Sequence, residues 1–196
     1  MLTVQVTTTS TLQQEASKQL NFSTQKTMRI AQQLYEGVDV KGLGTVGLIT
    51  YLRTDSVRIS DEAEKMAKEY IENNYGSEFA KNDSTEVKTA KKVQDAHEAI
   101  RPTDIARTPQ AVKDSLSRDQ FRLYQLIWKR FLASQMSPAV YETTQVKISA
   151  GEYILNSSAS KLVFDGFLSV YKDDEEKSED NALINGIDKD TELSLD

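Results

Sequence analysis

The sequence predicts an α+β fold, in which a mainly helical unit is followed by a smaller β-rich unit. Apolar residues recur about every 3.6 residues through the first two-thirds of the chain, as in helices that bury one face. Pro138 ends this pattern, and apolar residues alternate with polar ones from Tyr141 onward. The change of period predicts a boundary between the two units near residue 137.

Two helices are expected near the N-terminus. Ser10 and Gln13 have the spacing of a capping box, which predicts a helix over residues 11–20. A second helix is expected over residues 24–36, between a capping serine and a terminating glycine. The glycine-rich segment 37–47 is expected to be a loop that leads into a short strand or extended stretch.

Three further helix starts follow. Ser60 is a candidate cap for a helix over residues 61–74, and Pro109 has the position of a first helical residue. Ser117 and Gln120 predict another capping box, before the longest helix, over residues 118–136. Its apolar stripe favours core packing for Trp128 over a role in base stacking.

The β-rich unit is expected to begin with a pair of strands. Residues 141–150 and 153–158 alternate in polarity on either side of a turn at Gly151, which predicts a hairpin. Two short apolar stretches follow, at residues 162–164 and 167–171.

Composition limits the kinds of site that the chain can hold. The 196 residues include 38% apolar residues, enough for one domain or slightly more. There is no cysteine and one histidine, so we expect no disulfide, no zinc site and no other metal site in this chain. No apolar run approaches the ~20 residues of a membrane span, and no signal peptide is visible, so we expect a cytoplasmic protein with no membrane contact.

The net charge of -6 is concentrated in the C-terminal tail. Residues 173–196 contain ten acids and two lysines, whereas residues 1–172 contain twenty acids and twenty-two lysines or arginines. A nearly neutral body can bind a DNA backbone where its cations cluster. Candidates are Arg53, Arg58, Lys88, Lys91, Lys92, Arg101 and Arg107, although the three lysines fit a solvated surface as well, within a polar connection over residues 77–94.

Residues 47–56, Gly-Leu-Ile-Thr-Tyr-Leu-Arg-Thr-Asp-Ser, place a phenol two positions from a guanidinium. A phenol attacks poorly at neutral pH unless a cation stabilises the phenolate or the charge on the phosphoryl group. On an extended backbone, Tyr51 and Arg53 would share one face, where the guanidinium could bind phosphate oxygens. The spacing alone also fits an ordinary packing tyrosine.

A second motif, Ala-His-Glu-Ala-Ile-Arg-Pro-Thr at residues 96–103, contains the single histidine. Together the two motifs resemble those of the bacterial type IA DNA topoisomerases, with Leu52 in place of the usual methionine. Residues 8–16 and 123–136 are similar to that family as well, and residues 162–171 match it more weakly. The chain looks more like topoisomerase I than topoisomerase III or reverse gyrase.

The resemblance implies a domain organisation. Residues 10–136 would form the active-site tyrosine domain, which is helical and winged-helix-like. Residues 1–9 and 137–171 would form part of a β-rich hinge domain, and residues 172–196 an acidic linker and the start of the next strand. The chain would then be part of a larger enzyme whose toprim domain, with its Mg²⁺ site, and most of whose gate domain lie outside it.

The resemblance also implies an activity, ATP-independent relaxation of negatively supercoiled DNA in the bacterial cytoplasm, at the nucleoid. Tyr51 would cleave single-stranded DNA through a 5'-phosphotyrosyl intermediate, which rejoins after strand passage. Arg53 and His97 would act on the scissile phosphate. The predicted DNA contacts are Arg53, Thr54, Ser56, His97 and Arg101. For Glu98 and Arg101, an orienting pair or the support of a helix end is favoured over direct participation in the reaction. Without the toprim domain the chain alone would be inactive.

Two other functions remain open from the residues alone. One is a non-catalytic winged-helix module that binds DNA, in which Tyr51 and Arg53 only contact phosphates. The other is a protein-interaction domain that uses the acidic tail. Neither accounts for the whole set of motifs.

Overall fold

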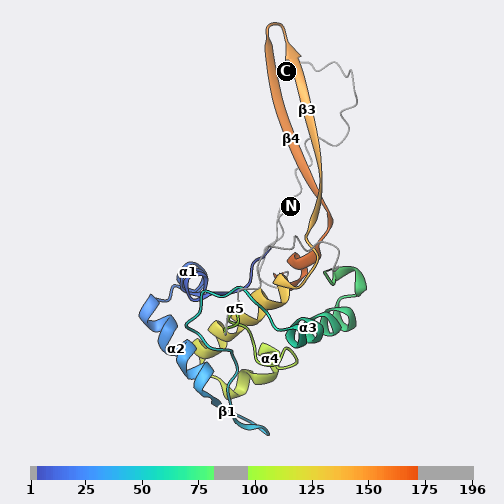
Figure 1. Ribbon diagram of the computed structural model, residues 1–196. Coiled ribbons are helices and arrows are strands. Elements are labelled where there is room, and N and C mark those ends of the chain that lie inside the picture. The colour runs from blue at the N-terminus through green and yellow to red at the C-terminus, as the bar shows by residue number, and fades with distance from the viewer. Residues whose placement is uncertain (1–3, 82–96, 172–196) are drawn as a thin grey trace.

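The computed structural model describes residues 4–81 and 97–171, which form a helical body and a long hairpin that projects from it (Figure 1). The fold is α+β, as predicted. The body contains α1 (Thr9–Leu20), α2 (Thr24–Glu36), β1 (Val38–Val40), β2 (Gly44–Val46), α3 (Asp61–Asn74), η1 (Ser77–Phe79), α4 (Pro109–Val112), η3 (Lys113–Ser115), α5 (Arg118–Ser134) and η4 (Gly166–Tyr171). The projecting hairpin consists of β3 (Val140–Ala150) and β4 (Tyr153–Phe164).

Four of the predicted helix starts are confirmed. The side chains of Ser23, Ser60, Thr108 and Ser117 each accept a hydrogen bond from a backbone amide in the first turn that follows. These bonds satisfy amides that have no partner within the helix, which explains why each helix begins where it does.

The start of α1 differs from the prediction. Its N-cap is Thr8, whose side chain accepts a hydrogen bond from the amide of Thr11, while the Thr11 hydroxyl accepts one from the Thr8 amide at 2.8 Å. Ser10 lies inside the first turn. The capping box is therefore formed by two threonines, and a search for glutamine or glutamate at the third position misses it.

Helix α5 lies at the centre of the body and packs against α1, α2, α4 and η4 (Figure 1). Trp128 is 6% exposed, which confirms its predicted core position. Its indole N–H donates to the carbonyl of Ile105 at 3.0 Å, and the hydroxyl of the buried Tyr124 donates to the carbonyl of Arg107 at 2.6 Å. Two aromatic side chains of α5 thus fix the segment that follows the histidine motif.

Residues 51–60 contain no strand, so of the two conformations expected there only the extended stretch remains. Two other segments correct the sequence-based expectations. The segment expected to be a loop contains the antiparallel pair β1–β2, with Val38 opposite Val46. Residues 166–171 form η4, which packs against α5 through the buried Phe167 and Val170 instead of extending the β-rich unit. In each case a short apolar pattern was compatible with both conformations, and tertiary packing decided between them.

The β3–β4 hairpin pairs along its whole length, with Thr144 opposite Ala159, and β4 continues six residues beyond the predicted end, to Phe164. Most of its side chains are exposed, including four apolar ones: Tyr153, Ile154, Leu155 and Val163. A two-stranded sheet is marginally stable by itself in water. The hairpin therefore offers apolar surface on which further structure could pack.

Several predictions from the sequence lie outside the described residues. These are most of the polar connection at 77–94, with Lys88, Lys91 and Lys92, and the acidic linker and following strand at 172–196. Within the described part, no helix is both long enough and apolar enough to cross a membrane.

The buried hydroxyl of Tyr124 predicts a measurable contribution to stability. Changing Tyr124→Phe removes the bond to the Arg107 carbonyl, and a lost buried hydrogen bond costs about 1–3 kcal/mol in the free energy of unfolding. Urea unfolding at pH 7 measures this loss, with Tyr141→Phe on the exposed hairpin as the matched control. Equal unfolding midpoints for the two variants would contradict the prediction.

The free energy of unfolding of the same variant should depend on alkaline pH less strongly than that of the wild type. Burial raises the pKa of Tyr124 above its ordinary value of 10.0. The unfolded chain therefore releases this proton first, so that the stabilisation from Tyr124 is complete below pH 10.0 and falls as the pH rises toward the folded-state pKa. The Tyr124→Phe variant should lose less stability than the wild type between neutral pH and pH values above 10.0.

Candidate active site around Tyr51

The two motifs, far apart in sequence, are paired through their backbones. Ile49 and Pro102 form an antiparallel bridge, the Thr103 amide donates to the Leu48 carbonyl at 3.0 Å, and the Thr50 amide donates to the Arg101 carbonyl at 2.9 Å. The chain therefore brings the tyrosine motif and the histidine motif together, as their combination in the sequence suggested.

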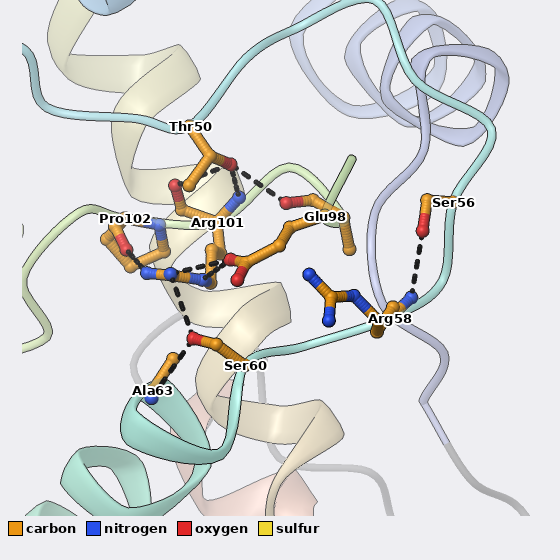
Figure 2. Close-up of polar contacts among 9 residues, drawn as sticks. Thr50, Ser56, Arg58, Ser60, Ala63, Glu98, Arg101 and Pro102 are labelled. Atoms are coloured by element: carbon orange, nitrogen blue, oxygen red, sulfur yellow. Dashed lines mark hydrogen bonds and ion pairs between the residues drawn. The ribbon is translucent and has the colours of Figure 1, made fainter. Parts of the chain in front are cut away.

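The Thr50 hydroxyl strengthens this pairing (Figure 2). It donates to the Ala99 carbonyl at 2.8 Å and accepts from the Arg101 amide at 3.0 Å. One side chain thus bonds the backbone on both sides of Ile100, which is itself buried. Because Thr50 immediately precedes Tyr51, these bonds fix the backbone position from which the Tyr51 side chain extends.

The Tyr51 side chain is 40% exposed and contacts two aromatic neighbours. The His97 ring stacks on it, with centroids 5.7 Å apart and planes 29° apart. The Tyr35 ring, from the last turn of α2, meets it edge-on at 5.5 Å and 69°. The phenol is therefore accessible to a large substrate while its ring keeps defined contacts.

Residues 51–56 alternate between exposed and buried side chains, although they form no strand. Tyr51, Arg53 and Asp55 are exposed, and Leu52 between the first two is 1% exposed. The cation two positions after the phenol is thus presented to solvent, as the predicted pairing of nucleophile and phosphate clamp requires.

Thr9 holds this segment from the start of α1. Its hydroxyl donates to the Leu52 carbonyl at 2.8 Å and to the Thr54 carbonyl at 3.0 Å, and it accepts from the Thr54 amide at 2.8 Å. The Thr9 amide also donates to the Thr54 carbonyl at 2.9 Å. The backbone that carries Arg53 is therefore tied to a helix on both sides of that residue.

Thr54 and Ser56 use their hydroxyls within the protein. The Ser56 amide donates to the Thr54 hydroxyl at 3.0 Å, and the Arg58 amide donates to the Ser56 hydroxyl at 3.2 Å. The two side chains are 7% and 5% exposed. They shape the turn after Arg53, and the DNA contacts predicted for them stay predictions.

Glu98 and Arg101 form an ion pair at 2.6 Å on the side of the paired segments that faces α3 (Figure 2). The Arg101 guanidinium also donates to the Pro102 carbonyl at 3.0 Å and to the Ser60 hydroxyl, at the N-cap of α3, at 3.4 Å. Arg58 points toward this pair in Figure 2. These contacts suit a residue that positions the motif, and the predicted contact between Arg101 and DNA stays a prediction.

Sequence reasoning gave no role to Thr9, Tyr35 or Thr50, although each contacts the site. Thr9 and Thr50 lie inside the quoted motifs, so their hydroxyls were available as candidates but had no visible partner. Tyr35 lies in the last turn of α2, and no motif in the sequence marks it as part of the site. Only the fold shows that its ring lies beside Tyr51.

The residues around Tyr51 do not suit a metal ion. Among the described residues, no group of three or more His, Cys, Asp or Glu side chains is placed to hold one. The imidazole of His97 stacks on the Tyr51 ring, and the exposed guanidinium of Arg53 follows two positions later in the chain. Both groups suit an anionic ligand such as a phosphodiester.

The bonds of the Thr50 hydroxyl give a stability prediction. Thr50→Val keeps the shape of the side chain but leaves the Ala99 carbonyl and the Arg101 amide without this partner, which should cost about 1–3 kcal/mol in unfolding free energy. Thr45→Val on the exposed strand β2 is the matched control and should change little. Chemical denaturation of both variants tests this, and similar losses in the two would refute a special role for Thr50.

Comparisons with known proteins identify the family of the chain. A family model described as DNA topoisomerase matches residues 4–196. Full-length topoisomerase I from Thermotoga maritima has a similar structure, with a TM-score of 0.77 and 44% sequence identity. The match covers 91% of this chain and 29% of that protein, so the chain spans less than a third of its length. The chain therefore belongs to the family of bacterial type IA DNA topoisomerases.

Proposed function

We propose that this chain supplies the nucleophile of an ATP-independent type IA topoisomerase, which relaxes negatively supercoiled DNA by cutting one strand, passing another through the break and rejoining the first. The observation that carries the proposal is the half-exposed Tyr51 ring stacked on His97, at the point where the two motifs pair. Membership of the family supports the same reaction.

The proposed chemistry consists of two transesterifications. The Tyr51 oxygen attacks a backbone phosphorus of single-stranded DNA and loses its proton. A new bond forms between that oxygen and phosphorus, the bond from phosphorus to the 3'-oxygen breaks, and the 3'-oxygen leaves as a hydroxyl. In the second step this hydroxyl loses its proton and attacks the phosphorus of the 5'-phosphotyrosyl link. The bond from phosphorus to the Tyr51 oxygen breaks, and that oxygen takes up a proton to restore the phenol. The number of phosphoester bonds is unchanged, so no ATP is needed.

Arg53 and His97 are the proposed phosphate ligands. The exposed guanidinium of Arg53 would stabilise charge on the phosphoryl oxygens, an effect that in other enzymes is worth about 10²-fold or more in rate. His97 would donate a hydrogen bond to the phosphate or to the adjoining backbone. The DNA contacts predicted for Thr54, Ser56 and Arg101 belong to the same proposal. Their bonds within the protein support a first role in holding the loop.

Magnesium is assigned to the toprim domain of the parent enzyme, because the described residues of this chain offer no suitable set of ligands. The proton for the leaving 3'-oxygen is assigned to that domain as well. We expect the chain alone to be inactive in relaxation. Its partners would be single-stranded DNA and the toprim and gate domains, in the bacterial cytoplasm.

The proposed domain limits are those that the resemblance implies, although η4 at residues 166–171 packs against α5 of the body. Residues 10–136 would be the tyrosine domain, with the winged-helix-like arrangement of the family. Residues 1–9 and 137–171 would belong to the hinge, where the exposed apolar side chains of β3 and β4 would find cover. Residues 172–196 would lead toward the gate domain.

The role of Tyr51 can be tested directly. The chain is mixed with a separately produced toprim-containing fragment, Mg²⁺ and an end-labelled single-stranded oligonucleotide, and the products are separated on a denaturing gel. We expect a protein–DNA adduct that carries the DNA downstream of the cut and is absent with Tyr51→Phe. The phenol oxygen is the only heavy atom that this substitution removes.

Tyr35→Phe is the matched control, since it removes a neighbouring phenol oxygen. If a mixture shown to assemble and bind DNA gave no adduct, or if Tyr51→Phe still gave one, the nucleophile would be assigned wrongly. Tight DNA binding without any adduct would favour the non-catalytic binding module.

The chain alone should bind single-stranded DNA weakly and with strong salt dependence. Few phosphate contacts are available without the other domains, and each contact released by salt contributes about 0.7 to the slope of log K against log salt concentration. Fluorescence anisotropy with a labelled oligonucleotide at several salt concentrations measures this slope. Nanomolar binding that does not change with salt would be inconsistent with the proposal.

A further inference from the structure

The Tyr51 ring has a second aromatic neighbour that the chemistry above does not use. Tyr35 meets it edge-on, with the ring centroids 5.5 Å apart and the planes at 69°. This is a favoured arrangement for two aromatic rings, because the positive edge of one ring faces the negative face of the other. Tyr35 and Tyr51 are 39% and 40% exposed, so the contact lies at the surface and not in the core.

Tyr35 is held firmly relative to the segment that carries Tyr51. It lies in the last turn of α2, and the carbonyl of its neighbour Leu34 accepts a hydrogen bond from the Leu48 amide at 2.8 Å. A Cβ atom on Gly47 would lie 2.6 Å from the Tyr35 carbonyl oxygen, closer than such atoms approach. Glycine at this position therefore lets the end of α2 pack directly against the tyrosine motif.

A half-exposed nucleophile needs such a neighbour. Attack on phosphorus requires the phenol oxygen to lie in line with the bond that breaks, and an exposed side chain samples other rotamers unless its neighbours restrict it. The backbone bonds of Thr50 fix the position of the Tyr51 Cα, but they do not fix the direction of its ring. The ring contacts with Tyr35 and His97 restrict that direction.

We propose that Tyr35 is a positioning residue for Tyr51, whose ring, through its edge-on contact, holds the phenol in the orientation needed for attack. This inference rests on the proposed function. The Tyr35 hydroxyl takes no part in the reaction, and no proton or bond changes at Tyr35.

The test uses a complete type IA enzyme that contains this chain. The single-turnover rate of adduct formation is measured at saturating single-stranded DNA, together with the dissociation constant for the same DNA. We expect Tyr35→Leu to slow adduct formation about threefold to tenfold, the loss that corresponds to one aromatic pair, with an unchanged dissociation constant. Tyr35→Phe keeps the ring and should therefore react at the wild-type rate. Tyr153→Leu, which removes a tyrosine from β4 and leaves the ring contacts of Tyr51 intact, should have no effect on the rate.

A second measurement does not depend on activity. With 3-fluorotyrosine placed at position 51, the ¹⁹F resonance should shift and change width in the Tyr35→Leu variant but stay close to its original position in Tyr35→Phe. This reports on the ring contact even if the leucine variant is less stable or the enzyme inactive.

The outcomes separate this inference from the proposed function. An unchanged rate for Tyr35→Leu, a loss explained by weaker DNA binding, or an equal loss for Tyr35→Phe would each overturn the positioning role. An unchanged ¹⁹F resonance in Tyr35→Leu would overturn it as well. By contrast, an enzyme that forms no adduct dependent on Tyr51 would contradict the proposed function, while the ¹⁹F result would still decide the ring contact.

Discussion

The pairing of two backbone segments about fifty residues apart is the constraint on which the site depends. The bonds between Thr50 and residues 99–101 close this pairing, and the Ile100 amide in turn donates to the Thr7 carbonyl at 2.7 Å. Three segments thus meet in a small sheet-like crossing built from single bridges. No alternating pattern in the sequence reveals this crossing, because each segment contributes only one or two residues to it. Without it, the phenol and the imidazole would lie on unrelated parts of the surface.

Burial on one side of this crossing explains exposure on the other. Leu48, Ile49, Leu52 and Ile100 are all buried in the common core, whereas Tyr51, next to Leu52, is 40% exposed. The anchoring of Thr54 by Thr9 continues this alternation past Arg53. The candidate residues Tyr51 and Arg53 are exposed while their apolar neighbour Leu52 is buried, so the packing of the core also positions the candidate site.

Helix limits could be predicted from the sequence because caps are local. Ser23, Ser60 and Ser117 act within three residues of themselves, and so they were recognised. The hairpin β1–β2 and the helix η4 were missed because short apolar segments take the conformation that the tertiary structure favours. The identity of Tyr51, Arg53 and His97 as candidates came from motifs, whereas the contact of Tyr35 with Tyr51 depends on the packing of α2 against Gly47, for which no local pattern exists.

The nucleophile proposed here has to receive a DNA strand, so burial cannot hold it, and this limits how it can be oriented. A core tyrosine such as Tyr124 is fixed by contacts on all sides, but no polymer could reach its hydroxyl. Tyr51 instead follows a hydrogen-bonded backbone segment, makes aromatic contacts along its ring and is 40% exposed. Each aromatic contact is worth about 1 kcal/mol, which is enough to favour one orientation and small enough to let the ring adjust when the substrate arrives. Tyr51 combines a preferred ring orientation with exposure because it lies at the edge of the core.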